Sequence, residues 1–206
     1  MNFRNLIILF FCQLISSTGQ LVVVTLGGII GSSLTDSQSI ATLPVSLMVV
    51  VTALTAIPAT MLMRRIGRKY GSAIASLSAA IAVLLAAYAI KTQSFILFAL
   101  SAAMFGINAA FSQQYRYAAA ESVNQEFVSR SISLILLGAI GGAMLGPELV
   151  TRGQFWISGI QYAGTLISLA LLFVIQAILL LSLGDFSITE EGNDNEGLTE
   201  IIIRKH

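Results

Sequence analysis

Residues 64–69 read Arg64-Arg65-Ile66-Gly67-Arg68-Lys69 and lie between two long apolar runs. Four of the eleven lysines and arginines of the chain fall in these six positions. Moving Lys or Arg across a bilayer is costly and is opposed by the membrane potential, so a loop of this charge density stays on the cytoplasmic side. The stretch therefore predicts a tight cytoplasmic turn between two membrane-spanning helices, and it orients the helices on either side.

The composition of the whole chain indicates a polytopic membrane protein. Of its 206 residues, 56% are hydrophobic and 10% are charged, and the mean hydropathy is +0.86. Soluble domains, in contrast, carry about 25% charged residues. The net charge is +1 and no basic surface with interleaved aromatic residues is evident, so nucleic acid is not an expected partner. The single cysteine, Cys12, excludes an internal disulfide and a cysteine-based metal motif.

Six apolar segments are long enough to cross a bilayer, because a hydrocarbon core about 30 Å thick requires roughly 20 apolar residues per helix. Their connections are short, so successive helices should be antiparallel neighbours in an all-α bundle. We expect the bundle to occupy residues 1–184 and an acidic cytoplasmic tail, the start of a central loop, to occupy residues 185–206. The expected spans are residues 6–30, 40–63, 71–90, 94–117, 131–151 and 157–183.

The basic residues are distributed unequally between the two sides of the predicted bundle. With the N-terminus inside, nine of them fall on or near the cytoplasmic side and two fall outside. Positive charge accumulates in cytoplasmic loops, so both termini are expected to be cytoplasmic. The nine are Arg4, Arg64, Arg65, Arg68, Lys69, Arg116, Arg130, Arg204 and Lys205, and the two are Lys91 and Arg152.

Polar side chains inside the expected spans are the default site candidates, because amides and charges are costly in hydrocarbon. We expect five of them to line a substrate path. Arg116 is equally compatible with an interface residue whose guanidinium reaches lipid phosphates. No Asp or Glu lies in the middle of any expected span, so no proton-coupling carboxylate is predicted. The five are Gln13, Gln20, Asn108, Gln113 and Arg116, and the remaining amides in the spans include Gln114, Gln161 and Gln176.

Catalytic, cofactor and metal sites are not predicted. The sequence contains no nucleophile-base pair, histidine cluster or phosphate loop in a fitting context, and His206 is the only histidine. A membrane enzyme acting on a lipid is therefore the weakest of the function classes considered.

Three glycines in the fifth expected span, Gly138, Gly142 and Gly146, recur every four residues and form a glycine stripe on one helical face. Such a stripe lets a second helix approach until the backbones touch. The stripe is either an ordinary helix-packing surface or a helix interface that moves or forms a seal during function. Pro147 lacks a backbone donor, so the helix is expected to kink or end near it.

The turn at residues 64–69 is similar to the signature of the major facilitator superfamily (MFS), G-x-L-A-D-R-x-G-R-K. In this sequence Thr60 replaces the first Gly and Arg64 replaces the Asp. Residues 118–130 resemble the family's loop between helices four and five, and residues 142–147 resemble the G-x-x-x-G-P part of a fifth-helix motif of drug antiporters. The signature residues that match in register are Arg65, Gly67, Arg68 and Lys69.

The resemblance implies the N-terminal six-helix half of an MFS transporter. Family members hold substrate between two halves and rock one half against the other. The second signature arginine is expected to pair with an acid after the fourth helix, here Arg68 with Glu121, as part of a cytoplasmic gate. The signature Asp is expected to meet a positive helix N-terminus of the other half. Arg64 reverses that charge.

The expected function is therefore transport of an unknown small solute by a multi-pass cell-membrane protein that contacts the lipid bilayer. The chain ends where a central loop would lead into a seventh helix, so we expect a half that is truncated or that pairs with itself or another chain. The alternative is a non-transporting accessory or regulatory protein that keeps the half fold and binds a partner through the glycine stripe.

Overall fold

The computed structural model describes residues 3–35, 37, 39–153, 156 and 162–184. The described chain contains six helical spans that are long and apolar enough to cross a membrane, and it has no strand. The expected all-α, six-span architecture is therefore confirmed. The expected acidic tail, residues 185–206, and Gln161 lie outside the described residues.

The spans are formed by seven α-helices, because the fourth span is divided in two. A short 3₁₀ helix, η1, follows the fourth span. The helices are α1 (Phe3–Ser33), α2 (Leu43–Ile66), α3 (Arg68–Lys91), α4 (Phe95–Ser112), α5 (Tyr115–Glu121), η1 (Gln125–Phe127), α6 (Val128–Gly153) and α7 (Ala163–Leu181).

The division of the fourth span lies at Gln113 and Gln114. Here the backbone bonds tighten to the i, i+3 pattern: Gln114 N–H donates to Phe111 O at 3.0 Å, and Tyr117 N–H donates to Gln114 O at 3.1 Å. After this turn the chain continues as α5 to Glu121, four residues beyond the end expected from the sequence. The turn places Arg116 beyond the regular helix that carries Asn108.

The course of α6 past Pro147 and the start of α7 bear on the sequence prediction. The helix α6 continues to Gly153, two residues beyond the expected span 131–151, so of the two alternatives at Pro147, a kink or an end, the end is wrong. Thr151 Oγ1 donates to Pro147 O at 2.9 Å, which is a different carbonyl from the one that loses a donor at Pro147, and proline is tolerated within membrane helices. The helix α7 begins at Ala163, directly after Tyr162, which has a left-handed φ of 65°, and residues 157–161 of the expected span lie outside the described residues.

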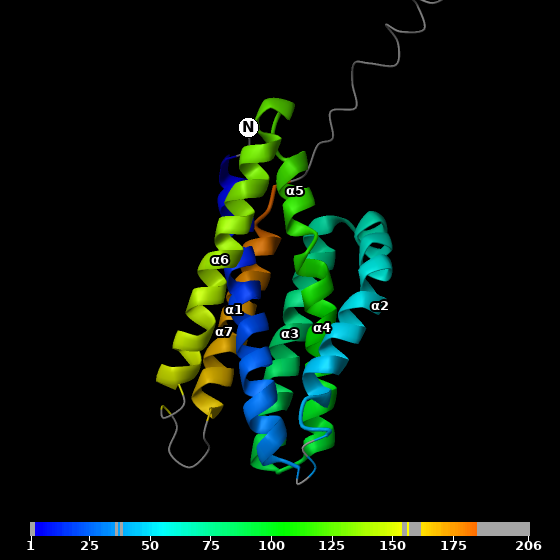
Figure 1. Cartoon of the computed structure of the whole chain (residues 1–206). Helices are drawn as coiled ribbons and strands as arrows, with labels where there is room; N and C mark the ends of the chain where they lie inside the picture. The colour runs from blue at the N-terminus through cyan, green and yellow to red at the C-terminus, as the bar shows by residue number, and fades with distance from the viewer. Residues whose placement is uncertain (1–2, 36, 38, 154–155, 157–161, 185–206) are drawn as a thin grey trace, which may run out of the picture.

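The helices pack in extended pairs. α1 lies against α6, α2 lies against α4, and α3 lies against both α4 and α7. The start of α1 and the end of α7 meet at one end of the bundle, where Arg4 Nη2 donates to Ser182 O and Gly184 N–H donates to Asn5 Oδ1, both at 3.2 Å. Figure 1 shows that the α2–α3 turn and α5 lie at this same end. We call it the N-terminal end.

Burial is uneven among the spans. The spans differ in the share of residues that are buried within the most apolar 18-residue stretch of each. This share is 56% in α3 and 50% in α7, but only 11% in α2 and 22% in the span that contains α6. The apolar side chains that α2 exposes include Leu54 and Ile57, at 71% and 72% exposure. The structure therefore has a packed centre and two spans with broad uncovered apolar faces.

Candidate functional site

The basic turn joins α2 to α3 at the N-terminal end of the bundle (Figure 1). α2 ends at Ile66, α3 begins at Arg68, and Gly67 between them has φ 87° and ψ 149°. Residues with a side chain rarely adopt this φ. A Cβ at Gly67 would meet no atom within 4 Å, so the backbone conformation, and not a lack of space, requires glycine there.

Arg68, the first residue of α3, forms an ion pair with Glu121, the last residue of α5. Arg68 Nη2 lies 2.5 Å from Glu121 Oε1, and the two side chains are 29% and 41% exposed. The pair ties the start of the third span to the end of the fourth. The other matched signature side chains do not join it: Arg65 is exposed, and Lys69 Nζ lies 5.9 Å from the ring centroid of Tyr70.

An open cleft of about 760 Å³ lies beside this ion pair, between α2, α3 and the α4–α5 segment. Both partners of the pair line it, as do Arg64 from α2 and Gln114 and Tyr117 from the fourth span. Arg64 is exposed and forms no ion pair within the described residues. The cleft therefore has charged side chains in its wall, and one of them, Arg64, is not paired with any carboxylate of the described chain.

The glycine stripe of α6 faces α1. A Cβ at Gly138 would lie 2.9 Å from Phe10 O, a Cβ at Gly142 would collide with Leu14 O, and a Cβ at Gly146 would lie 2.7 Å from the Cβ of Leu21. All three glycines are buried by this contact, whereas Pro147 beside them is exposed. The stripe is thus occupied within the chain and is not a free surface for a partner.

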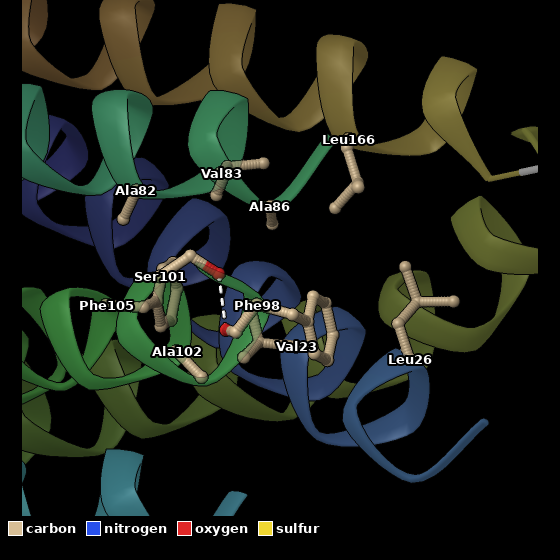
Figure 2. A pocket seen from close by; sticks show the side chains of 10 residues that line it. All are labelled: Val23, Leu26, Ala82, Val83, Ala86, Phe98, Ser101, Ala102, Phe105 and Leu166. Carbon is tan, nitrogen blue, oxygen red and sulfur yellow. Dashed lines mark hydrogen bonds between the residues drawn. The ribbon is translucent and has the colours of Figure 1, made fainter. Parts of the chain in front are cut away.

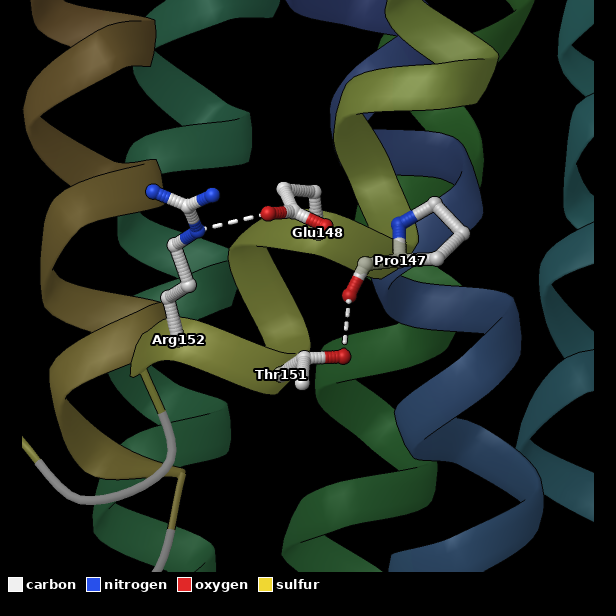
Figure 3. A network of polar contacts seen from close by, with 4 residues as sticks. All are labelled: Pro147, Glu148, Thr151 and Arg152. Atoms are coloured by element: carbon white, nitrogen blue, oxygen red, sulfur yellow. Dashed lines mark hydrogen bonds and ion pairs between the residues drawn. The ribbon is translucent and has the colours of Figure 1, made fainter.

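Near its end, α6 carries a short polar network, shown in Figure 3. Arg152 Nε donates to Glu148 Oε1 at 2.5 Å across one helical turn, and Thr151 donates to Pro147 O. The Arg152 and Glu148 side chains are 74% and 55% exposed. Glu148 is therefore an exposed acid paired along its own helix, and it does not lie in the middle of the span.

The five polar residues expected to line a substrate path do not form one cluster. Gln13 Nε2 donates to Ser17 on its own helix at 3.1 Å. Gln20 reaches across to α4, where its Nε2 donates to Ser112 Oγ at 3.1 Å. Asn108 lies one turn before Ser112 on α4 and is fully buried, and neither atom of its amide has a partner in the described chain. Because Asn108 lies one turn from Ser112 on α4, we call Gln20, Ser112 and Asn108 the polar patch, although no hydrogen bond joins Asn108 to the other two.

Gln113 and Arg116 lie apart from that patch. Gln113 is exposed at the turn between α4 and α5, and its carbonyl accepts a 3.2 Å bond from Arg116 Nε. The Arg116 guanidinium carbon lies 5.6 Å from the ring centroid of Tyr117. Arg116 thus sits at the N-terminal end of the bundle among half-exposed groups, away from the middle of the membrane.

The structure also shows a buried polar cluster that sequence reasoning did not assemble. Gln176 of α7 is fully buried, and its Nε2 donates to Ser16 Oγ of α1 and to Tyr115 Oη of α5, both at 2.9 Å. The cluster links three spans through neutral groups. An amide in the otherwise apolar sixth span was the available signal, but spacing alone does not identify its partners on other helices.

Elsewhere in the bundle, the core contains a small apolar cavity (Figure 2). It has a volume of about 20 Å³ and is lined by α1, α3, α4 and α7. Its one polar side chain, Ser101, donates to Phe98 O on its own helix, so the wall offers no free polar group. A space of this size and character is a packing defect rather than a solute site.

Comparison with known proteins identifies the fold. The sequence model of the Major Facilitator Superfamily matches residues 7–199. The chain belongs to the major facilitator superfamily. It is 32% identical over 169 residues to the riboflavin transporter RfnT of Brucella anthropi and 29% identical over 181 residues to the uncharacterized MFS-type transporter YddS of Bacillus subtilis. These alignments cover 82% and 86% of this chain but 42% of each relative.

Membership of this family places the six spans in a cell membrane, and the chain is a multi-pass membrane protein. MFS proteins are transporters, which are a non-enzyme class, and they act on small molecules within a lipid bilayer. The chain spans less than half the length of the curated relatives it matches. This coverage corresponds to the half architecture expected from the signature turn.

Proposed function

We propose that this chain is the N-terminal half of a secondary transporter that moves a small solute by alternating access. The family match and the 42% coverage of both relatives support this proposal. In it, both termini lie in the cytoplasm, residues 1–184 form the bundle, and residues 185–206 begin a loop toward a second half. No catalytic role is assigned to any residue.

The single observation that carries the proposal is the uneven burial of the spans. Only 11% of the residues in the most apolar stretch of α2 are buried, and only 22% in that of the span containing α6. Both helices therefore offer broad apolar faces to a neighbour. A second six-helix half, from the same or another chain, would cover these faces. α3 and α7 are already packed against each other, so they leave less apolar surface for a second half to cover.

The solute path is proposed to run past the polar patch of Gln20 and Asn108, with Gln13 along the same helix and Gln113 and Arg116 near the N-terminal end. Asn108 is fully buried in this conformation, so its amide reaches a solute only when the helices around it move apart. The Arg68–Glu121 pair would act as a gate at the cytoplasmic end, with Arg65, Gly67 and Lys69 shaping the turn.

The chemistry of these groups suits a neutral polar solute that both donates and accepts hydrogen bonds. Four of the five proposed path residues are amides, each of which has donors and an acceptor. Because one relative is named a riboflavin transporter, riboflavin is the first substrate that we propose to test.

Cross-linking tests the proposed second half directly. In a Cys12→Ser background, we expect Leu54→Cys on α2 to form a cross-linked dimer in membranes, or to label a second six-helix chain. The matched control is Leu171→Cys on α7, which is also apolar and is 62% exposed. Equal cross-linking of the two variants, or none from Leu54→Cys, would contradict the proposed interface.

Uptake into liposomes tests the path. The full chain, reconstituted as the assembly that cross-linking captures, should take up labelled riboflavin saturably, and Gln20→Ala should reduce this uptake. Gln93→Ala serves as the control, because Gln93 lies in the turn between α3 and α4. Uptake that survives substitution of all five path residues would show that the path lies elsewhere.

A further inference from the structure

The cleft beside the Arg68–Glu121 pair has more hydrogen-bond donors than the protein satisfies. Arg68 uses Nη2 on Glu121, while its Nη1 is buried and has no hydrogen-bond partner in the described chain. An arginine has five donors and cannot be deprotonated in a protein, so a buried donor without an acceptor is costly. An acceptor that reaches Nη1 would remove that cost, which requires the Arg68 guanidinium to turn toward the cleft that its side chain lines.

The other groups that line the cleft also suit an anion. Arg64 enters from the last turn of α2 and Arg68 from the first turn of α3, and together they outnumber the single carboxylate of Glu121. Gln114 and Tyr117 add an amide and a hydroxyl from the fourth span. A volume of about 760 Å³ leaves room for a headgroup-sized ligand.

The position of the cleft relative to the apolar spans indicates which kind of anion would bind there. It lies where α2 ends and α3 begins, at one end of the apolar spans, which is the level of the lipid headgroups. Phosphate is the abundant anion at that depth, and basic pockets between membrane helices bind phospholipid headgroups. Arginine matches phosphate because its planar fork can donate two parallel hydrogen bonds.

We propose that Arg64, Arg68, Gln114 and Tyr117 form a binding site for a phosphate group at the N-terminal end of the bundle. The phosphate would bind Arg64 in a bidentate manner and would accept from Arg68 on the side that Glu121 does not occupy. Its source is either an anionic phospholipid or a free phosphate. The proposal does not depend on transport, because the site would bind its ligand in a chain that moves no solute.

The chain provides a matched pair of variants for the test. Arg64 and Arg65 are adjacent, both are exposed in the last turn of α2, and only Arg64 lines the cleft. Arg64→Gln and Arg65→Gln therefore remove the same charge from the same surface. Arg64→Lys keeps the charge but removes the planar fork, and it guards against a folding defect in the glutamine variant.

The experiment uses the full chain in a neutral detergent. Dioleoyl phosphatidylglycerol is added in one arm and sodium phosphate in the other, with chloride at equal ionic strength as the reference. Native mass spectrometry measures bound lipid, and the melting temperature as a function of added ligand gives the affinity in both arms. For Arg64→Gln we expect binding weaker by at least roughly tenfold, because the charge-assisted contacts of Arg64 are lost, with an intermediate loss for Arg64→Lys and almost none for Arg65→Gln.

The binding results identify the source of the phosphate and can contradict the proposed site. Binding of phosphatidylglycerol alone identifies a lipid headgroup as the source, whereas an equal response to sodium phosphate identifies a free phosphate. The proposal is overturned if Arg64→Gln and Arg65→Gln weaken binding equally, because that is a general charge effect. It is also overturned if the unmodified chain binds neither ligand.

Discussion

The α1–α6 interface and the Arg68–Glu121 pair both join distant parts of the chain, but different physical effects hold them. At the interface, three buried glycines bring two backbones into contact, and no charge takes part. At the N-terminal end, two partly exposed charges meet at the edge of an open cleft. The interface therefore tolerates almost no added volume, whereas the ion pair can be replaced at small cost. The packing of the first region thus constrains the fold more strongly than the ion pair of the second region does.

The largest expected effect breaks the interface. Gly142→Leu would force a side chain into Leu14 O and Ser17, so we expect destabilisation of about 3 kcal/mol, the upper end for overpacking, and a severe loss of folded protein. Gly141→Leu is the control, because a Cβ there would lie 3.6 Å from Leu14 Cδ1, an ordinary contact. Folded yield after detergent extraction, measured by size-exclusion chromatography, compares the two. Normal yield for Gly142→Leu would show that the two helices do not touch at this glycine.

An intermediate effect on stability is expected in the Gln176 cluster. This cluster is buried, as the α1–α6 interface is, and it is held by polar groups, as the Arg68–Glu121 pair is. Gln176→Leu removes both of its bonds and leaves Ser16 and Tyr115 without this donor, so we expect a loss of about 1–2 kcal/mol. Tyr115→Phe removes the bond that Gln176 donates to Tyr115 but keeps the bond to Ser16, so it should cost less. Unfolding in increasing denaturant checks this order, and a larger loss for Tyr115→Phe would show that the ring packing outweighs the amide.

The smallest expected effect concerns the ion pair. Arg68→Ala and Glu121→Ala should each change stability by about 0.2–1 kcal/mol, as partly exposed pairs do. Because the residues are in contact, the double variant should cost less than the sum of the single variants. The same denaturation measurement on all four proteins closes the cycle. Additive losses would show that the pair contributes nothing beyond its two separate side chains.

The sequence prediction of the path residues was less specific than that of the ion pair. Arg68 and Glu121 could be linked in advance, because the resemblance assigned both positions and the structure brings them together. Gln113 and Asn108 looked equivalent as amides of one span, yet one is exposed at a turn and the other is fully buried. The turn at Gln113 and Gln114 separates them, and helical periodicity across it could not foresee the change.

The sequence alone determined the six spans, the glycine stripe and the family-like turn, since each depends on local composition or on spacing along one helix. Tertiary structure decided which groups meet. It placed the stripe against α1, joined Gln176 to Ser16 and Tyr115, and left α2 largely uncovered. The physical reason is that spacing fixes which residues share a face of a helix, whereas the rotation and register of each helix against its neighbours fix what that face contacts.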